Sequence, residues 1–275
     1  MIPDFLYNHS NWLVGLTVAG SFVGFGLALL LLAHTLLPKD WRSRHNEFVG
    51  FMLAVVSVVY AVLLAFLAIA VWESFGKAGE IAAREASLAG DLAHDSMAMP
   101  EPLRGVVVAE VKGYLGWVIG EEWPAMGRGE ALSGEDGPGA ALADVGWARL
   151  FGIHQALAAF KAADSVQTAM FSEVLARLNS LYDARRDRLL QSEEHLQPVV
   201  WGVVLFGAAI TIAFTTLFGM DSLLMHGLMT AAVAAIIALV VLLIVAFDYP
   251  YRGKVQITPD AYRHVLQVLV RAGER

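Results

Sequence analysis

Four long stretches of the chain contain no Asp, Glu, Lys or Arg, and they set the plan of the molecule. They run over residues 12–37, 49–72, 199–218 and 223–247. An α-helix rises about 1.5 Å per residue, and the hydrocarbon core of a bilayer is about 30 Å thick, so about 20 apolar residues suffice to cross it. The pattern therefore predicts four transmembrane helices.

The second apolar run continues beyond the membrane without a break. After Trp72 the sequence passes directly into Glu73, Lys77 and Glu80, and no proline follows before Pro100. Because proline is the strongest helix breaker, its absence allows the helix to extend. We expect one long helix that crosses the bilayer and continues into water.

Short connections determine how the four helices pair. A polar turn over residues 39–45 joins the first two runs, and Gly219 to Ser222 joins the last two. Connections this short predict two antiparallel hairpins. Gly20 and Gly24 lie four residues apart in the first run, a spacing that lets a neighbouring helix approach closely. Glycine is also simply common in membrane helices, so a packing role and a compositional origin both stay open.

The region between the hairpins has helical composition throughout. One helix is expected from Pro102 to Pro124, because proline is tolerated in a first turn and ends a helix elsewhere. Residues 127–139 are rich in glycine and acidic side chains and predict a flexible, exposed loop. Apolar residues then recur at helical spacing over residues 140–196, which predicts a single long helix.

These patterns divide the chain into five parts and predict an all-α fold, because no strand signal appears. The parts are an N-terminal segment (1–11), a first transmembrane hairpin (12–73), a helical soluble region (74–196), a second transmembrane hairpin (197–248) and a C-terminal tail (249–275). We expect the tail to end in a short amphipathic helix after Thr258 and Pro259.

Composition agrees with a membrane protein that carries an acidic soluble part. Hydrophobic residues make up 57% and charged residues 16% of the chain, against roughly 45–50% and about 25% in soluble proteins. Residues 74–196 contain 11 Lys or Arg and 18 Asp or Glu, which accounts for the whole formal charge of −7. The absence of cysteine excludes disulfides and thiolate metal sites. No basic stripe is present, so nucleic-acid binding is not predicted.

The distribution of basic residues predicts the orientation in the membrane. Four spans place both termini and residues 74–196 on the same side. Near the membrane that side carries more basic residues than the other, which holds Lys39, Arg42 and Arg44. The positive-inside rule therefore favours a cytoplasmic soluble part in a plasma (inner) membrane. The N-terminus has no Lys or Arg before the first run, so no cleaved signal peptide is expected.

No arrangement of residues predicts an enzyme, a cofactor or a metal site. Glu121 and Glu122 are adjacent, so on a helix they point about 100° apart, and we interpret them as part of a solvated surface. His34 and His226 lie near span ends and are expected at the membrane interface. Since no Asp, Glu, Lys or Arg lies within a span, an ion-coupled transporter is not favoured.

Apolar residues on the second span offer a lining for an ion pathway. Val58, Val62 and Phe66 recur every four residues and could form a hydrophobic constriction that gates by dewetting. A second stripe, formed by Val59, Leu63 and Leu67, is equally good on spacing alone. The choice of face therefore stays open at this point.

Several motifs in this order resemble the bestrophin-like family of bacterial four-span proteins and, more distantly, the bestrophin channels. The resemblance rests on the segments Tyr60–Phe75, Glu85-Ala86, Glu122-Trp123, Arg185–Leu189, Pro198 with Trp201, and Asp248–Gly253, which includes Pro250. The resemblance assigns structural roles to Glu85, Glu122, Trp123, Arg185, Pro250 and Gly253. It also implies a homo-oligomer, pentameric in bestrophins, whose second span lines a central pore with a neck at Val58, Val62 and Phe66.

One departure from the family pattern concerns calcium. In bestrophins, an acidic cluster associated with calcium follows the fourth span, whereas in this sequence Arg252 and Lys254 follow it. No calcium site is therefore expected.

Two functions from different classes remain. The first is an oligomeric ion channel that contacts membrane lipid, other copies of itself and a permeating small ion. The alternative is a non-conducting membrane scaffold or sensor that binds a partner through its acidic helical region.

Overall fold

A computed structural model describes residues 11–133 and 137–273, and every regular element in these ranges is helical. The all-α prediction is therefore confirmed. The expected N-terminal segment lies outside the described residues except for Asn11. The helices are α2 (Asn11–Leu36), α3 (Lys39–Arg44), α4 (Asn46–Asp95), η1 (Ser96–Ala98), α5 (Leu103–Trp117), η2 (Val118–Glu122), α6 (Trp123–Arg128), α7 (Pro138–Ala158), α8 (Ser165–Glu193), α9 (Pro198–Thr216), α10 (Leu223–Asp248) and α11 (Asp260–Gly273).

The chain forms two compact units. The membrane unit comprises the chain up to Ser74 together with His195–Asp248, and the head unit comprises Phe75–Glu194 together with Tyr249–Arg275. The sequence set the tail apart as a separate part, but the tail packs with the head. Helix α4 is a single 50-residue helix that contributes to both units, as the long uncharged second run predicted.

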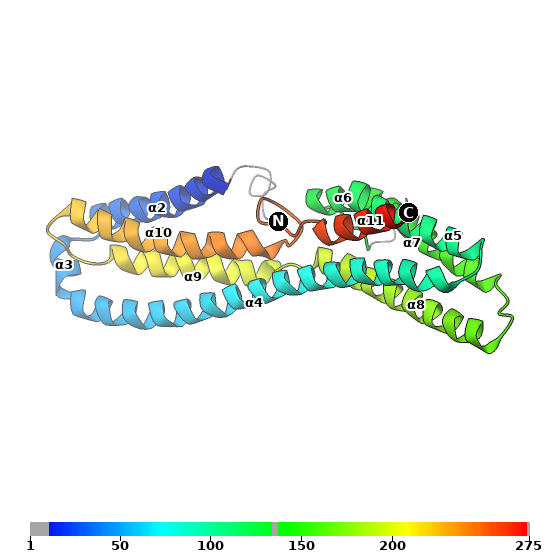
Figure 1. Cartoon of the computed structure of the whole chain (residues 1–275). Coiled ribbons are helices and arrows are strands. Elements are labelled where there is room, and N and C mark those ends of the chain that lie inside the picture. Colours follow the sequence, from blue (N-terminus) through cyan, green and yellow to red (C-terminus); the bar gives the residue numbers. More distant parts are fainter. Residues whose placement is uncertain (1–10, 134–136, 274–275) are drawn as a thin grey trace. The chain divides into compact units, whose positions relative to one another are not determined.

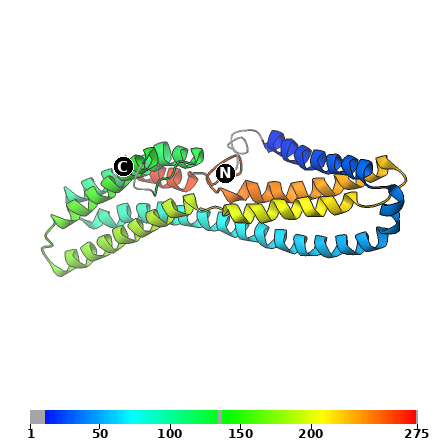
Figure 2. The same ribbon diagram turned by 180° about the vertical axis from the view of Figure 1, so that it is seen from behind.

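The membrane unit contains the four predicted spans. Helices α2, α4, α9 and α10 contribute apolar segments that are long enough to cross a bilayer. Figure 1 shows α2, α10, α9 and the first half of α4 running side by side, and Figure 2 shows the same arrangement from behind. Helix α2 packs most extensively on α10. The α2–α3–α4 connection and the α9–α10 turn close the two hairpins at one end of this unit.

A set of polar contacts ties the ends of the two hairpins together. The side chain of Asn46 accepts a hydrogen bond from the N–H of Gly219 (2.8 Å) and donates one to its carbonyl oxygen (3.2 Å). Arg42, although charged, is buried, and it donates to the carbonyl oxygen of Phe218 (3.3 Å) and contacts Nδ1 of His34 (3.1 Å). Gly219 has no space for a side chain, because a Cβ there would overlap backbone atoms of the first hairpin.

The two histidines of the spans occupy different environments. His34 is exposed beside Arg42, whereas His226 is buried inside the membrane unit. Nε2 of His226 donates to the carbonyl oxygen of Thr215 (2.8 Å). His226 lies close to Leu223, where α10 begins, and a carbonyl oxygen near the end of α9 satisfies its N–H; its position at the membrane interface stays a prediction.

Glycines in α2 differ in what they contact. A side chain at Gly20 or Gly24 would meet no atom of this chain within 4 Å. Gly26 is instead the glycine that lies against α9 and α10, where a Cβ would be 3.1 Å from Ile212 and 3.2 Å from Thr230. The packing role of Gly20 and Gly24 stays a prediction, and it concerns contact with another molecule.

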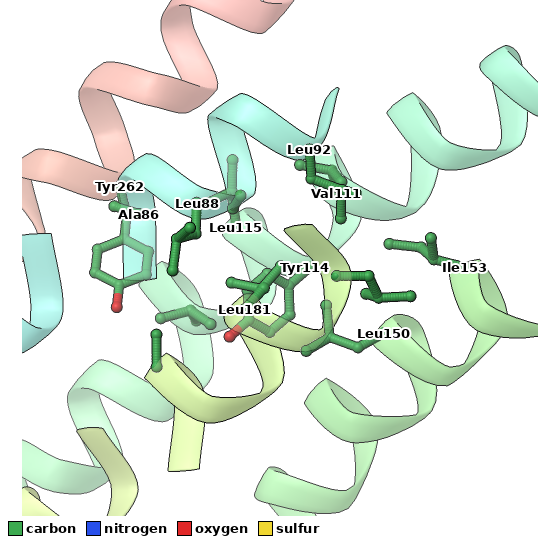
Figure 3. Packing of buried hydrophobic residues seen from close by; sticks show 14 of the residues in the cluster. Ala86, Leu88, Leu92, Val111, Tyr114, Leu115, Leu150, Ile153, Leu181 and Tyr262 are labelled. Carbon is green, nitrogen blue, oxygen red and sulfur yellow. The ribbon is translucent and has the colours of Figure 1, made fainter. Parts of the chain in front are cut away.

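The head unit has one apolar core, built from α5, α7, α8, α11 and the second half of α4. Figure 3 shows Leu88 and Leu92 of α4, Val111 and Leu115 of α5, and Leu181 of α8 meeting around the ring of Tyr114. The amphipathic C-terminal helix predicted by the sequence is α11, and its Tyr262 is fully buried in this core.

Two sequence expectations about the head are wrong. The helix expected to end at Pro124 continues through the π-helical turn η2 into α6, which ends at Arg128, and Pro124 lies at the beginning of α6, directly after that turn. The helix expected over residues 140–196 is two helices, α7 and α8. Asp164 starts α8 by accepting a hydrogen bond from the N–H of Gln167 (2.7 Å), which is an N-cap.

Tyr60 connects α4 to α9. Its hydroxyl donates to the carbonyl oxygen of Val204 (2.9 Å), and its ring lies over Gly207. A Cβ at position 207 would be 2.6 Å from two ring carbons of Tyr60. A side chain at this position would therefore have to displace the ring of Tyr60.

The substitution Gly207→Ala should destabilise the membrane unit by about 1–3 kcal/mol, since the added methyl group overpacks the contact with Tyr60. Gly202→Ala is the matched control, because a Cβ at that position of the same helix meets nothing within 4 Å. It should leave stability unchanged or raise it by up to about 1 kcal/mol. Denaturation of both variants in detergent measures the difference, and equal effects would contradict this account of the contact.

Candidate functional site

One face of α4 is packed within the membrane unit and the opposite face is free. Tyr60, Leu64 and Val71 lie on the packed face and are almost fully buried. Val58, Val62 and Phe66 lie on the opposite face, where 64%, 51% and 70% of each residue is exposed. The three residues that the sequence proposed for a neck are therefore available for contact outside the chain.

The structure distinguishes the two stripes that spacing alone left equal. Leu63 and Leu67 of the second stripe are half-buried, and only Val59 is well exposed. The stripe of Val58, Val62 and Phe66 is exposed at every position. A lining for a shared axis fits this face better, although the pore role itself stays a prediction.

A second candidate site lies in the head, where four charged side chains are completely buried. Glu85 comes from α4, Glu122 from η2, and Arg185 and Arg188 from α8. Arg185 and Arg188 are three residues apart, so they lie on the same face of their helix. The intervening Arg186 and Asp187 point to solvent. The motif residues Glu85, Glu122 and Arg185, distant in sequence, thus meet at one point.

Glu122 links the two arginines. Its Oε1 accepts from Nη2 of Arg185 (2.7 Å), and its Oε2 accepts from Nη1 of Arg185 (3.0 Å) and Nη2 of Arg188 (2.7 Å). Two parallel bonds from one guanidinium to one carboxylate form the strongest geometry for such a pair. Arg185 also donates to the carbonyl oxygen of Ala143 (2.9 Å), which connects α7 to the pair.

Glu85 completes the chain of charges on the other side of Arg188. Its Oε2 accepts from Nε of Arg188 (2.7 Å), and its Oε1 accepts from Nη2 of Arg188 (3.2 Å) and from the hydroxyl of Tyr114. The order Glu85, Arg188, Glu122, Arg185 alternates in sign and is neutral in total. We call these four residues the buried charge chain.

Aromatic rings enclose the two guanidinium groups. The ring of Trp147 lies 4.7 Å from the centre of the Arg185 guanidinium, and those of Trp123 and Tyr262 lie 5.9 and 6.0 Å from that of Arg188. The negative face of an aromatic ring attracts a cation, and this attraction is stronger where water is excluded. The motif residue Trp123 therefore belongs to the wall of the site.

The chain that follows α10 closes the site. Pro250 accepts a hydrogen bond from the N–H of Ile257 (2.8 Å), and Gly253 adopts φ = 81°, a left-handed conformation that favours glycine. The resulting loop places the carbonyl oxygen of Ile257 3.0 Å from Nε1 of Trp123. Tyr251 stacks edge-on against the same indole, 5.3 Å away. Pro250 and Gly253 thus shape the loop that holds Trp123.

Gly146 of α7 leaves the space that the buried charge chain occupies. A Cβ at this position would overlap both Nη2 of Arg185 and Oε1 of Glu122. Sequence reasoning missed this residue, because a glycine within a helical pattern gives no sign of what it faces. It also misjudged Glu122, which is fully buried and not part of a solvated surface.

Electrostatics keep the carboxylate of Glu122 ionised. Burial raises its pKa, but attraction to Arg188 and Arg185 and the hydrogen bonds from both outweigh burial, so that the pKa lies below its usual value of 4.5. Burial and the neighbouring carboxylate of Glu85 raise the pKa of the Tyr262 phenol well above 10.0, and attraction to Arg188 offsets them only in part. At neutral pH the carboxylate is therefore charged and the phenol is neutral.

The buried charge chain is suited to bracing helices and not to chemistry. Arginine donors occupy the carboxylates, and no side chain of the four reaches solvent. Within residues 11–133 and 137–273, no group of three or more His, Asp or Glu side chains is arranged to hold a metal ion. The site fixes α4 to η2 and α8 inside the head.

Comparison with known proteins bears on the family and the fold of the chain. A sequence profile of the bestrophin-like domain matches residues 20–262. No curated protein matches the sequence. Three crystal structures of mutants of a bacterial bestrophin homologue from Klebsiella pneumoniae have a TM-score of 0.64, at 11%, 9% and 10% identity. They cover 93%, 95% and 94% of this chain and 99% of the homologue. At this identity the likeness concerns the fold.

The substitution Glu122→Gln should destabilise the head by about 3–5 kcal/mol, since it removes one partner of a buried ion pair and leaves two guanidinium groups incompletely paired. Glu121→Gln is the control, because the neighbouring Glu121 is exposed, and its effect should stay within about 0.5 kcal/mol. Denaturant titration followed by tryptophan fluorescence reports both values. Similar stabilities of the two variants would show that the charge chain does not support the head.

The stability gap between wild type and Glu122→Gln should depend on pH. Because the folded-state pKa of Glu122 is lowered, its contribution is present above the unfolded pKa of about 4.5 and is lost as pH falls through the folded value. The difference in stability should therefore be constant between about pH 6 and about pH 7 and should shrink below about pH 4. Denaturation midpoints across this range measure it. A gap that is unchanged at low pH would contradict an ionised Glu122.

Proposed function

This chain belongs to the bestrophin-like family, and we propose that it forms an oligomeric ion channel whose pore is lined by α4. The observation that carries the proposal is the exposed apolar face of Val58, Val62 and Phe66, opposite the packed face of the same helix. In an assembly of several copies around an axis, these residues would form successive apolar rings.

A pore of this kind would conduct without charged residues in the membrane. Val58, Val62 and Phe66 offer no hydrogen bonds to water, so a narrow ring of them would empty of water in a closed state and fill in an open state. The absence of Asp, Glu, Lys and Arg from the uncharged run of α4 suits this mechanism. The resemblance to bestrophins favours a pentamer.

The buried charge chain supports the same function from the head. Glu85 lies on α4, so its bonds to Arg188 and Tyr114 hold this helix in one rotational setting within the head. A pore-lining helix needs such a fixed orientation, because a rotation would carry the lining face away from the axis. The distribution of basic residues favours a location in the plasma (inner) membrane, with both termini and the head in the cytoplasm.

The substitution Phe66→Ala should change single-channel conductance or open probability at least severalfold, since it removes the largest side chain of the constriction. Phe206→Ala on α9 is the matched control. Phe206 is exposed to nearly the same extent as Phe66, at 69% against 70%, but lies on another helix. Its currents should equal those of wild type.

Recordings of purified protein in planar bilayers test this prediction. Unchanged currents in Phe66→Ala would show that Phe66 does not form a constriction of the pore. No single-channel steps from the wild type under any salt gradient, together with a monomer or dimer by native mass spectrometry, would favour the scaffold or sensor.

A further inference from the structure

The face of α4 that carries the neck residues continues into the head as a row of charged side chains. Eighteen residues of α-helix make five full turns, so residues 18 apart lie directly above one another. Val62 is in phase with Glu80, Phe66 with Arg84, and Glu73 with Asp91. All three pairs are exposed. The helix therefore presents one free face that is apolar in the membrane and charged in the head.

Carboxylates lie nearer the centre of this face than the basic residues. At about 100° per residue, Glu80 has the same angular position as Val62, and Glu73 and Asp91 are displaced by about 20°. Arg84 and Lys77 are displaced by about 40° and 60°. Among the charged residues of this face, Glu80 is thus the one whose angular position on the helix is nearest to that of the neck residues.

The surroundings of Glu80 are also acidic. It lines an open cleft of about 780 Å³ in the head, whose charged lining consists of Lys77, Glu80, Arg84, Asp187, Glu193 and Glu194. Four carboxylates against two basic groups give this cleft a net negative charge. Among the residues that the structure describes, Glu80 forms no ion pair, so its charge remains available to a mobile ion.

We propose that Glu80 is a specificity-determining residue of the channel and that it favours cations over anions. In an assembly around a shared axis, one Glu80 from each copy would form a ring of negative charge on the cytoplasmic side of the neck. Such rings raise the local concentration of cations and lower that of anions. This inference rests on the proposed channel function and adds the class of ion that passes.

The experiment measures reversal potentials in planar bilayers under a tenfold KCl gradient. Wild type should be cation-selective. Glu80→Gln should lower the ratio of potassium to chloride permeability about sevenfold, because a potential of about one kT per unit charge changes the local concentration of each ion about threefold, in opposite directions. Glu121→Gln is the control, because it removes the same charge from an exposed position of the head that is not on α4, and it should leave the ratio unchanged.

The absence of cysteine from the chain allows a second, charge-reversing test. In Glu80→Cys, a methanethiosulfonate reagent that carries a sulfonate should restore cation preference, and one that carries a quaternary ammonium should abolish it. Both effects should weaken in 1 M salt, where the Debye length falls to about 3 Å.

The outcomes separate the two levels of the proposal. Cation-selective currents that respond to both reagents support the assignment of Glu80. Currents whose ion preference is the same in wild type, Glu80→Gln and both labelled forms overturn it and leave the channel function intact. The absence of wild-type currents overturns the channel function, and the assignment of Glu80 falls with it.

Discussion

The buried charge chain is the interaction on which the head depends. Removing Glu85, Glu122, Arg185 and Arg188 from water costs several kcal/mol per ion, and only close mutual pairing with further hydrogen bonds offsets such a cost. Each carboxylate here accepts from at least one guanidinium at 2.7 Å, and the total charge is zero. Because the four residues come from α4, η2 and α8, the pairing is satisfied only when these helices take one arrangement.

This arrangement has a consequence for α4. The helix is continuous over 50 residues, and Glu85 is held inside the head while Tyr60 and Leu64 are held inside the membrane unit. Both contacts leave the opposite face of the helix free. The proposed pore follows from this division, since a free face at a fixed rotational setting is what a lining helix requires. The packing of Tyr60 on Gly207 and the pairing of Glu85 thus both fix the rotational setting of α4.

Composition predicted the membrane spans and the helical fold because both depend on long runs of similar residues. The break between α7 and α8 also has a local signal, the N-cap Asp164, which the apolar period masked. The burial of Glu122 had no local signal. Its partners lie more than 60 residues away, and η2 is a π-helical turn, so α-helical spacing misplaces its side chains. The resemblance to a family marked Glu122 and Arg185 as motifs but not as partners of each other.

The central claim is that the free face of α4 meets copies of itself around a shared axis. Since the chain has no cysteine, Val62→Cys introduces a single thiol on that face, and Val203→Cys introduces one on an exposed part of α9. Treatment in membranes with a short bifunctional thiol reagent should link Val62→Cys into covalent dimers and leave Val203→Cys monomeric. If the thiol at position 62 reacts with a lipid-soluble monofunctional reagent but forms no links between copies, α4 faces lipid and the account is contradicted.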